Sequence, residues 1–180
     1  LDPQSSNVFQ APYRLFVGGS EADDFALTSV YVPYGRNNLA AFVSVNSDGT
    51  SPDYGTFSVL RLTNATSEAE NEQTSGPGQV ANEFANDDGI NQTLQALRIT
   101  ARVTFGNMLT LPVDDRMMYV QPVYAQSQSA SDTSYPVLRY VLIKFGDSVA
   151  YGENLPAAIR SLYSGTGTDT GTDPGTDAGT

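Results

Sequence analysis

The sequence contains no cysteine and no histidine among its 180 residues. Without cysteine there are no disulfides and no thiolate nucleophile, and most zinc and iron sites are excluded. Without histidine there is no Ser-His-Asp triad and no side chain that normally shuttles protons at neutral pH. Any chemistry must therefore use carboxylates, hydroxyls, tyrosine, lysine or arginine.

Positive charge is also scarce. Nine Lys and Arg residues stand against 20 Asp and Glu residues, which gives a net charge of −11 and an isoelectric point near 4.1. The nine basic residues are scattered singly, so no local cluster opposes the negative field. Because this field repels phosphate backbones and anionic headgroups, we expect no nucleic-acid partner.

Long apolar runs are missing as well. No stretch approaches the roughly eighteen residues that span a bilayer, and the N-terminus has neither a basic nor an apolar leader region. We expect a soluble segment, and a first residue other than Met suggests one excised from a longer protein. The expected organisation is an irregular lead-in over residues 1–12, a single domain over 13–163 and a disordered Gly/Thr/Asp-rich tail over 164–180.

Alternating and β-branched residues predict strands in two groups, separated by a helical pair. In the helical pair, Val80 and Phe84 are four residues apart, and Ile90, Leu94 and Leu97 follow at helical spacing. A last helix opens near Asn154. The predicted strands cover residues 13–17, 25–32, 39–45, 56–62, 101–111, 117–124 and 136–145. We therefore predict an α+β fold: a mainly antiparallel sheet of about six strands, two short central helices and a C-terminal helix packed on one face.

The turn between the second and third predicted strands carries the most distinctive polar cluster. Arg36, Asn37 and Asn38 follow Pro33, Tyr34 and Gly35 and offer three strong hydrogen-bonding side chains. They are the candidate binding residues, for a carboxylate or a sugar. The alternative is structural and is favoured by the residue types, because Asn tolerates left-handed backbone and Arg can bind carbonyls of a neighbouring loop.

Carboxylates offer the other route to chemistry. A hydrolase-type or metal-dependent site would need at least two of six aspartates to converge in a cleft: Asp23, Asp48, Asp53, Asp87, Asp114 and Asp147. An acidic calcium-responsive surface is a third possibility, because the tail carries Asp169, Asp173 and Asp177 at every fourth position. Isolated acids on turns are usually only solvated, so we expect no catalytic residue, no metal ligand and no cofactor.

Several blocks of this sequence resemble a known family. They are the runs at residues 33–42, 76–80, 106–112, 119–124 and 151–163, which include Pro-Tyr-Gly-Arg-Asn-Asn, Gly-Pro-Gly-Gln-Val and Gly-Asn-Met-Leu-Thr-Leu-Pro. In this order they resemble the C-terminal extracytoplasmic region of uncharacterised protein family 0182, which comprises large multi-pass membrane proteins of actinobacteria and cyanobacteria. The resemblance covers roughly residues 25–163.

The resemblance implies a location but no activity, because the family has no assigned reaction. It implies a segment at the extracytoplasmic face of the cell membrane, following transmembrane helices that lie elsewhere. The expected function is a non-catalytic interaction or structural domain of an integral membrane protein. The expected partners are the remainder of its own membrane-anchored chain and, as a further candidate, components of the cell envelope.

Overall fold

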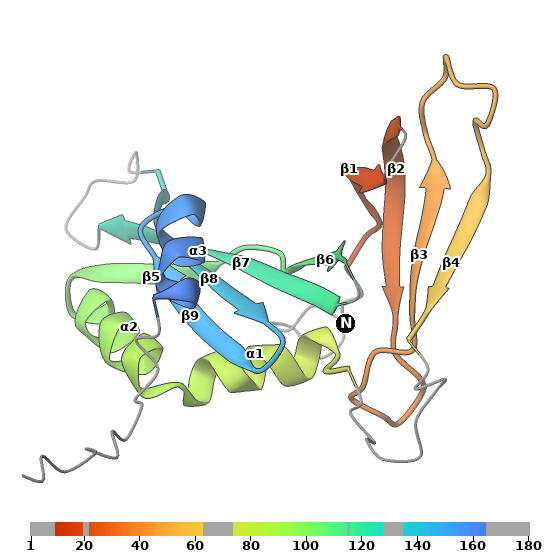
Figure 1. The fold of residues 1–180 in the computed structure, drawn as a ribbon. Coiled ribbons are helices and arrows are strands. Elements are labelled where there is room, and N and C mark those ends of the chain that lie inside the picture. Colours follow the sequence, from red (N-terminus) through yellow and green to blue (C-terminus); the bar gives the residue numbers. More distant parts are fainter. Residues whose placement is uncertain (1–9, 20–21, 63–73, 115, 128–134, 165–180) are drawn as a thin grey trace, which may run out of the picture.

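A computed structural model describes residues 10–19, 22–62, 74–114, 116–127 and 135–164. Within these residues it contains nine strands and three helices (Figure 1). The strands are β1 (Tyr13–Gly19), β2 (Ala22–Tyr31), β3 (Ala41–Asn46), β4 (Phe57–Arg61), β5 (Ala101–Phe105), β6 (Leu109–Val113), β7 (Arg116–Ser127), β8 (Val137–Phe145) and β9 (Ser148–Gly152). The helices are α1 (Pro77–Asn86), α2 (Asp88–Thr100) and α3 (Leu155–Tyr163).

The first four strands form an antiparallel meander in the order β1-β2-β3-β4. The hairpin predicted around the polar turn is present, with Tyr31 opposite Ala41 and Val30 opposite Phe42. This sheet lies at one end of the molecule, beside β6 and the beginning of α1 (Figure 1). The predicted meander is therefore confirmed, and β1 extends it at the β2 edge.

The second sheet has five strands, ordered β5-β7-β8-β9, with β6 pairing with β7 on the same edge as β5. The sequence predicted one strand over residues 101–111, and this prediction is wrong, because the strand is interrupted between Phe105 and Leu109. Pro122 of β7 lies opposite Gly106, and its nitrogen has no N–H to donate to the Gly106 carbonyl. The Gly106 carbonyl instead accepts a hydrogen bond from the Gln121 side-chain amide.

The helices begin where the sequence predicts. Pro77 occupies the first turn of α1, where its missing N–H is harmless. The Asp87 carboxylate accepts a hydrogen bond from the Ile90 N–H and caps α2, and Asn154 caps α3 by accepting from the Ala157 N–H. These caps satisfy N–H groups that have no partner within a helix.

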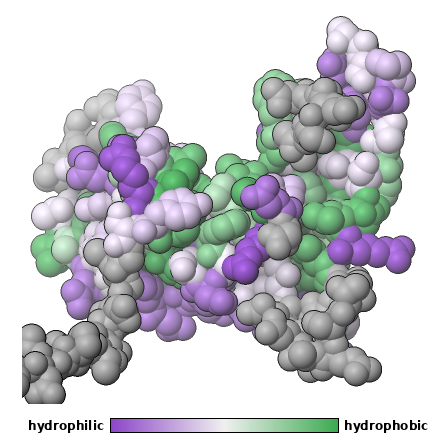
Figure 2. Space-filling view, in the orientation of Figure 1, coloured by the Kyte–Doolittle hydropathy of each residue, from purple (hydrophilic) through white to green (hydrophobic). Residues whose placement is uncertain are grey.

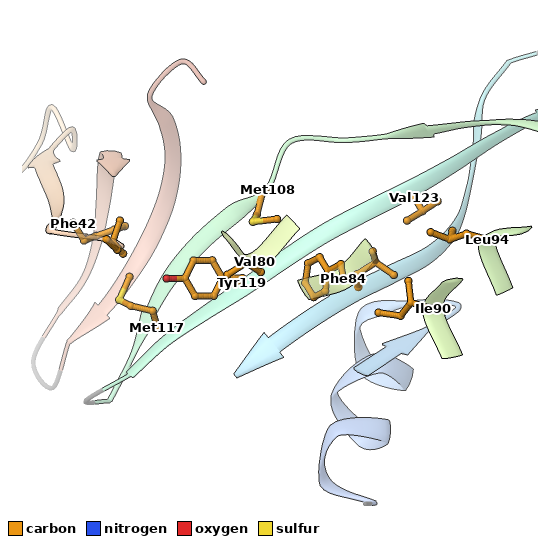
Figure 3. Packing of buried hydrophobic residues seen from close by; sticks show 11 residues of the cluster. Phe42, Val80, Phe84, Ile90, Leu94, Met108, Met117, Tyr119 and Val123 are labelled. Atoms are coloured by element: carbon orange, nitrogen blue, oxygen red, sulfur yellow. The ribbon is translucent and has the colours of Figure 1, made fainter. Parts of the chain in front are cut away.

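Two clusters of buried residues cover the two faces of the second sheet. One joins Val80 and Phe84 of α1 and Ile90 and Leu94 of α2 to Tyr119 and its neighbours (Figure 3). On the opposite face, α3 packs its Ala158 on Val120, Val141, Ile143 and Ala150. Phe42 of β3 and Leu39, just before β3, enter the first cluster, so the same apolar core extends to both sheets.

The predicted α+β class is confirmed, with antiparallel sheets, a helical pair between the two groups of strands and a C-terminal helix on one face. The described strands number nine, in two sheets of four and five. Residues 101–111 contribute to two of these strands, β5 and β6, because the chain leaves the sheet between Phe105 and Leu109. Most of the predicted lead-in and nearly all of the predicted tail lie outside the described residues, so these two predictions stand as predictions.

The core makes a direct prediction about stability. Replacing Phe84→Ala removes a fully buried ring from the first cluster and is expected to lower the free energy of unfolding by about 3–5 kcal/mol. The matched control Phe57→Ala removes an exposed ring, and its cost is expected to stay below about 1 kcal/mol. Urea denaturation of the three proteins measures both; equal losses would contradict this core.

Candidate functional site

The predicted binding residues lie together on the exposed turn between β2 and β3. Gly35 adopts a positive φ of 71°, and the Arg36 N–H donates to the Pro33 carbonyl at 3.1 Å, which closes the turn. Arg36 and Asn37 are exposed and Asn38 is half-buried. To the other described residues, the three side chains make no hydrogen bond or ion pair.

The backbone of this turn is attached to the segment that leads into α1. The Gly76 N–H donates to the Asn37 carbonyl at 2.9 Å, and the Leu39 N–H donates to the Thr74 carbonyl at 2.9 Å. Asn38 and Ser75 form the antiparallel bridge between them. A side chain on Gly76 would collide with the Asn37 carbonyl oxygen, so the close approach requires glycine. We name these two paired segments, residues 37–39 and 74–76, the junction.

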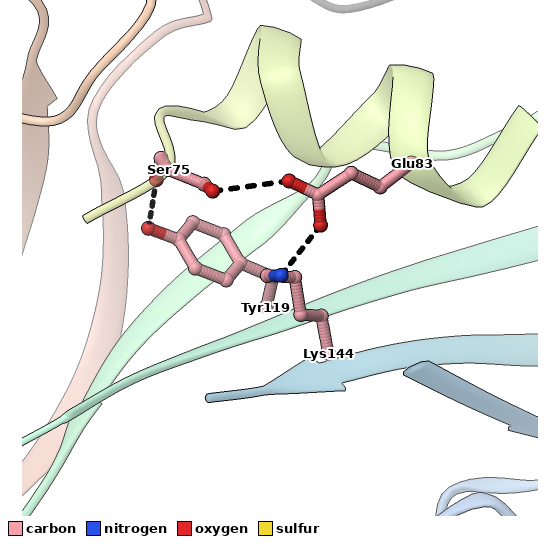
Figure 4. A network of polar contacts seen from close by, with 4 residues as sticks. All are labelled: Ser75, Glu83, Tyr119 and Lys144. Carbon is pink, nitrogen blue, oxygen red and sulfur yellow. Dashed lines mark hydrogen bonds and ion pairs between the residues drawn. The ribbon is translucent and has the colours of Figure 1, made fainter. Parts of the chain in front are cut away.

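A polar network lies directly behind the junction (Figure 4). The Ser75 hydroxyl donates to the Glu83 carboxylate at 3.0 Å, and the other oxygen of that carboxylate pairs with the Lys144 ammonium at 2.5 Å. The Tyr119 hydroxyl donates to the Ser75 carbonyl. Because Lys144 is buried, its charge depends on this carboxylate for a partner. The network thus links the junction to α1, β7 and β8.

A second polar contact joins the two sheets. The Tyr13 hydroxyl donates to the Thr110 carbonyl at 2.8 Å and accepts from the Thr110 N–H at 2.9 Å. Burial raises the pKa of Tyr13 above its ordinary value. Burial also raises the pKa of Tyr119 strongly, and the negative charge of Glu83 adds to the rise. Both phenols are therefore hydrogen-bond donors and not proton shuttles at neutral pH.

Of the six aspartates of the hydrolase hypothesis, Asp23 lies within β2, where it pairs with Gly18, and the other five lie on separate turns. Asp48 and Asp53 are in the β3–β4 loop, Asp87 caps α2, Asp114 is in the β6–β7 turn and Asp147 is in the β8–β9 turn. Asp48 accepts hydrogen bonds from the Thr50 N–H and hydroxyl, which lower its pKa. No group of three or more acidic side chains that could hold a metal ion occurs in the described ranges.

A pocket of about 310 Å³ lies between α1 and α2, above the second sheet. Asn82, Asn91, Arg98 and Gln121 supply its polar lining, and the remaining lining side chains are apolar. None of the lining residues is a carboxylate, a hydroxyl or an amine. The pocket can therefore offer amide and guanidinium hydrogen bonds, but it has no general acid or base.

The sheet formed by β1–β4 has two different faces. The inner face includes Tyr13, which contacts Thr110, Phe42, which enters the first core cluster, and Thr28, whose hydroxyl donates to the Tyr13 carbonyl at 2.9 Å. At β4 the inner-face side chains are exposed. The opposite side, which we name the outer face, comprises Arg14, Phe16, Phe25, Leu27, Ser29, Tyr31, Ala41, Val43, Val45, Phe57, Val59 and Arg61. Apolar side chains are visible at the surface over this sheet (Figure 2).

The fold and the site define an α+β domain in which a polar junction attaches a four-stranded sheet to a helix-covered sheet. Residues 2–97 match the model of Uncharacterised protein family (UPF0182), and the chain belongs to this family. It is 54% identical over 164 residues to a UPF0182 protein of Nocardioides sp. and 43% identical over 166 residues to one of Thermobifida fusca.

The matches cover very different shares of the two chains. They include 89% and 91% of this chain but only 16% of each of these two relatives. The chain therefore spans about one sixth of the length of the relatives it matches. No solved structure matches it. Of the helices in the described residues, none is long and apolar enough to cross a membrane.

The junction predicts opposite effects for two neighbouring glycines. Gly76→Ala introduces a methyl group against the Asn37 carbonyl, and we expect it to lower the free energy of unfolding by about 1–3 kcal/mol. Gly78→Ala, in open space on α1, is expected to be neutral or to stabilise by up to about 1 kcal/mol. Thermal unfolding distinguishes them, and equal effects would show that the close approach is unimportant.

The buried phenol predicts a pH dependence. Tyr119→Phe leaves the Ser75 carbonyl without its donor, which should cost about 1 kcal/mol at neutral pH. Because the pKa of Tyr119 is raised in the folded protein, its contribution is complete below the unfolded-state pKa of about 10 and is lost as the pH rises above it. The stability difference between wild type and variant should therefore shrink in alkaline solution. Denaturation at a series of pH values tests this, and a constant difference would contradict it.

Proposed function

We propose that this chain is a non-catalytic interaction domain within a larger, membrane-anchored protein, at the extracytoplasmic face of the membrane. The observation that carries the proposal is the outer face, where large apolar side chains have no covering element among the described residues. The span of about one sixth of the relatives' length supports it, because most of a family-length protein lies elsewhere. The membrane location rests on the family resemblance.

The local chemistry favours binding over catalysis. The pocket lining has no acid or base, and the six aspartates of the hydrolase hypothesis lie on β2 and on five separate turns. The two phenols with raised pKa values hold structural hydrogen bonds at Thr110 and Ser75. A pocket whose side chains can form hydrogen bonds to a ligand but cannot transfer protons fits an interaction domain.

The expected partner is the remainder of the same protein, with cell-envelope components as a second candidate. The net charge of −11 opposes binding to nucleic acid. On this acidic chain the exposed guanidinium of Arg36 is a local positive group, and its side chain makes no hydrogen bond or ion pair to other described residues. We propose that Arg36, Asn37 and Asn38 contact the partner.

The turn can be tested separately from the fold. Arg36→Ala should weaken binding of the 180-residue chain to the family-length protein lacking this segment by about tenfold, which corresponds to about 1.4 kcal/mol. Its melting temperature should not change. The charge-matched control Arg102→Ala alters an exposed arginine on the second sheet and should bind as the wild type does.

Calorimetric titration measures the binding of all three proteins. Equal loss in both variants would mean that only net charge matters. A lower melting temperature of Arg36→Ala with unchanged affinity would show that the turn is scaffold and would contradict its role in binding.

A further inference from the structure

We propose that the outer face of the β1–β4 sheet is a docking surface for an apolar, carboxylate-bearing surface of the same protein, formed by residues outside these 180. This inference rests on the proposed function and names the surface and the partner.

The alternation of side chains is the first observation. In β3, the inner-face positions are Phe42, Ser44 and Asn46, whereas the outer-face positions are Ala41, Val43 and Val45. In β2, the inner face carries Ala26, Thr28 and Val30, and the outer face carries Phe25, Leu27, Ser29 and Tyr31. The outer face is thus at least as apolar as the face that packs against the rest of the molecule.

This pattern is the opposite of what a solvated sheet shows. An antiparallel sheet with one wet face alternates apolar residues inward with polar residues outward. Here Phe16, Phe57, Tyr31 and Val59 of the outer face are 69%, 63%, 56% and 46% exposed. Neither core cluster includes Val43 or any other outer-face residue. The sequence of β1–β4 therefore suits a sheet that is covered on both sides.

The apolar side chains also form one continuous patch. Phe16 lies opposite Phe25 with ring centroids 5.3 Å apart. In the next row Leu27, Val45 and Phe57 are cross-strand neighbours, and beside them Val43 lies opposite Val59. A patch that crosses all four strands is typical of an interaction surface and not of scattered exposed residues.

The charges on this face indicate the chemistry of the partner. Among the outer-face side chains that the structure describes, Arg14 and Arg61 are the charged ones, and they lie on the two edge strands of the sheet. A complementary surface is therefore apolar at its centre and carries carboxylates at its margin.

A surface of the same protein is favoured over other occupants. In a family-length protein about five sixths of the chain lies outside a segment of this size, and tethering keeps it at high effective concentration. A second copy would bring another net charge of −11 and would place the same arginines against this face. An anionic lipid surface is repelled by the same net charge.

Cysteine labelling tests the proposal, because this chain has no native cysteine. Phe57→Cys and the matched control Ser58→Cys place a thiol on opposite faces of the same exposed strand. They are introduced singly into the family-length protein, with any cysteines outside the segment replaced. Ile99→Cys, on the exposed end of α2, reports on a distant surface. Maleimide labelling rates are measured before and after denaturation.

We expect Phe57→Cys to react at least tenfold more slowly than Ser58→Cys and Ile99→Cys in the native family-length protein. In the 180-residue chain, Phe57→Cys and Ser58→Cys should react at similar rates. If Phe57→Cys and Ser58→Cys also react at similar rates in the family-length protein, the proposal is overturned. If Phe57→Cys is already protected from labelling in the 180-residue chain, and light scattering gives the mass of a dimer, the outer face binds a second copy and the proposal is overturned. Protection that appears only with added anionic vesicles would assign it to lipid.

The same experiment separates this inference from the proposed function. If Phe57→Cys stays reactive while the 180-residue chain still binds the family-length protein lacking it, the domain docks through another surface and only the present inference fails. If Phe57→Cys stays reactive and no binding is measured, both fail.

Discussion

The pairing of two short backbone segments, residues 37–39 and 74–76, holds the two halves of this molecule in one arrangement. The hydrogen bonds from Gly76 to Asn37 and from Leu39 to Thr74 fix the turn after β2 against the entry to α1. They place Leu39 and Phe42 in the first core cluster, together with buried residues of α1 and β7. Behind them, Ser75 is hydrogen-bonded to Glu83 and Tyr119, and Glu83 pairs with Lys144. Backbone pairing, apolar burial and a charged pair therefore support the same contact.

This arrangement uses only one face of the β1–β4 sheet. The inner face supplies the Tyr13 contact to Thr110 and the Phe42 contact to the core, although it also carries Ser44 and Thr28. The outer face carries the larger share of aromatic and branched side chains, and no described element covers it. Complete burial of an exposed side chain of this kind contributes about 1.5–3 kcal/mol, and the outer-face side chains retain part of this, since Phe16 and Phe57 are 69% and 63% exposed whereas Val43 is already buried. The outer face therefore still exposes apolar surface that a binding partner could cover.

Much of this fold follows from local rules. The spacing of Val80 and Phe84, the cap at Asp87 and the polar turn at residues 33–38 each have a nearby signal, and each prediction is confirmed. The break between β5 and β6 has only a weak local signal, the Gly106-Asn107 pair within the run, because its cause is Pro122 lying opposite Gly106 on another strand. The sequence also gives no sign of the Tyr119–Ser75 contact, which joins residues 44 positions apart. The binding role of Arg36, Asn37 and Asn38 stays a prediction.

The central claim is that this domain docks through the outer face of its first sheet. Amide hydrogen exchange tests it most directly, by comparing peptides of β3 and β4 in the 180-residue chain and in the family-length protein. The account predicts slower exchange of these peptides in the family-length protein. Peptides from α3, on the far side of the second sheet, should serve as the unchanged reference. Equal exchange of the β3 and β4 peptides in both proteins would contradict the account.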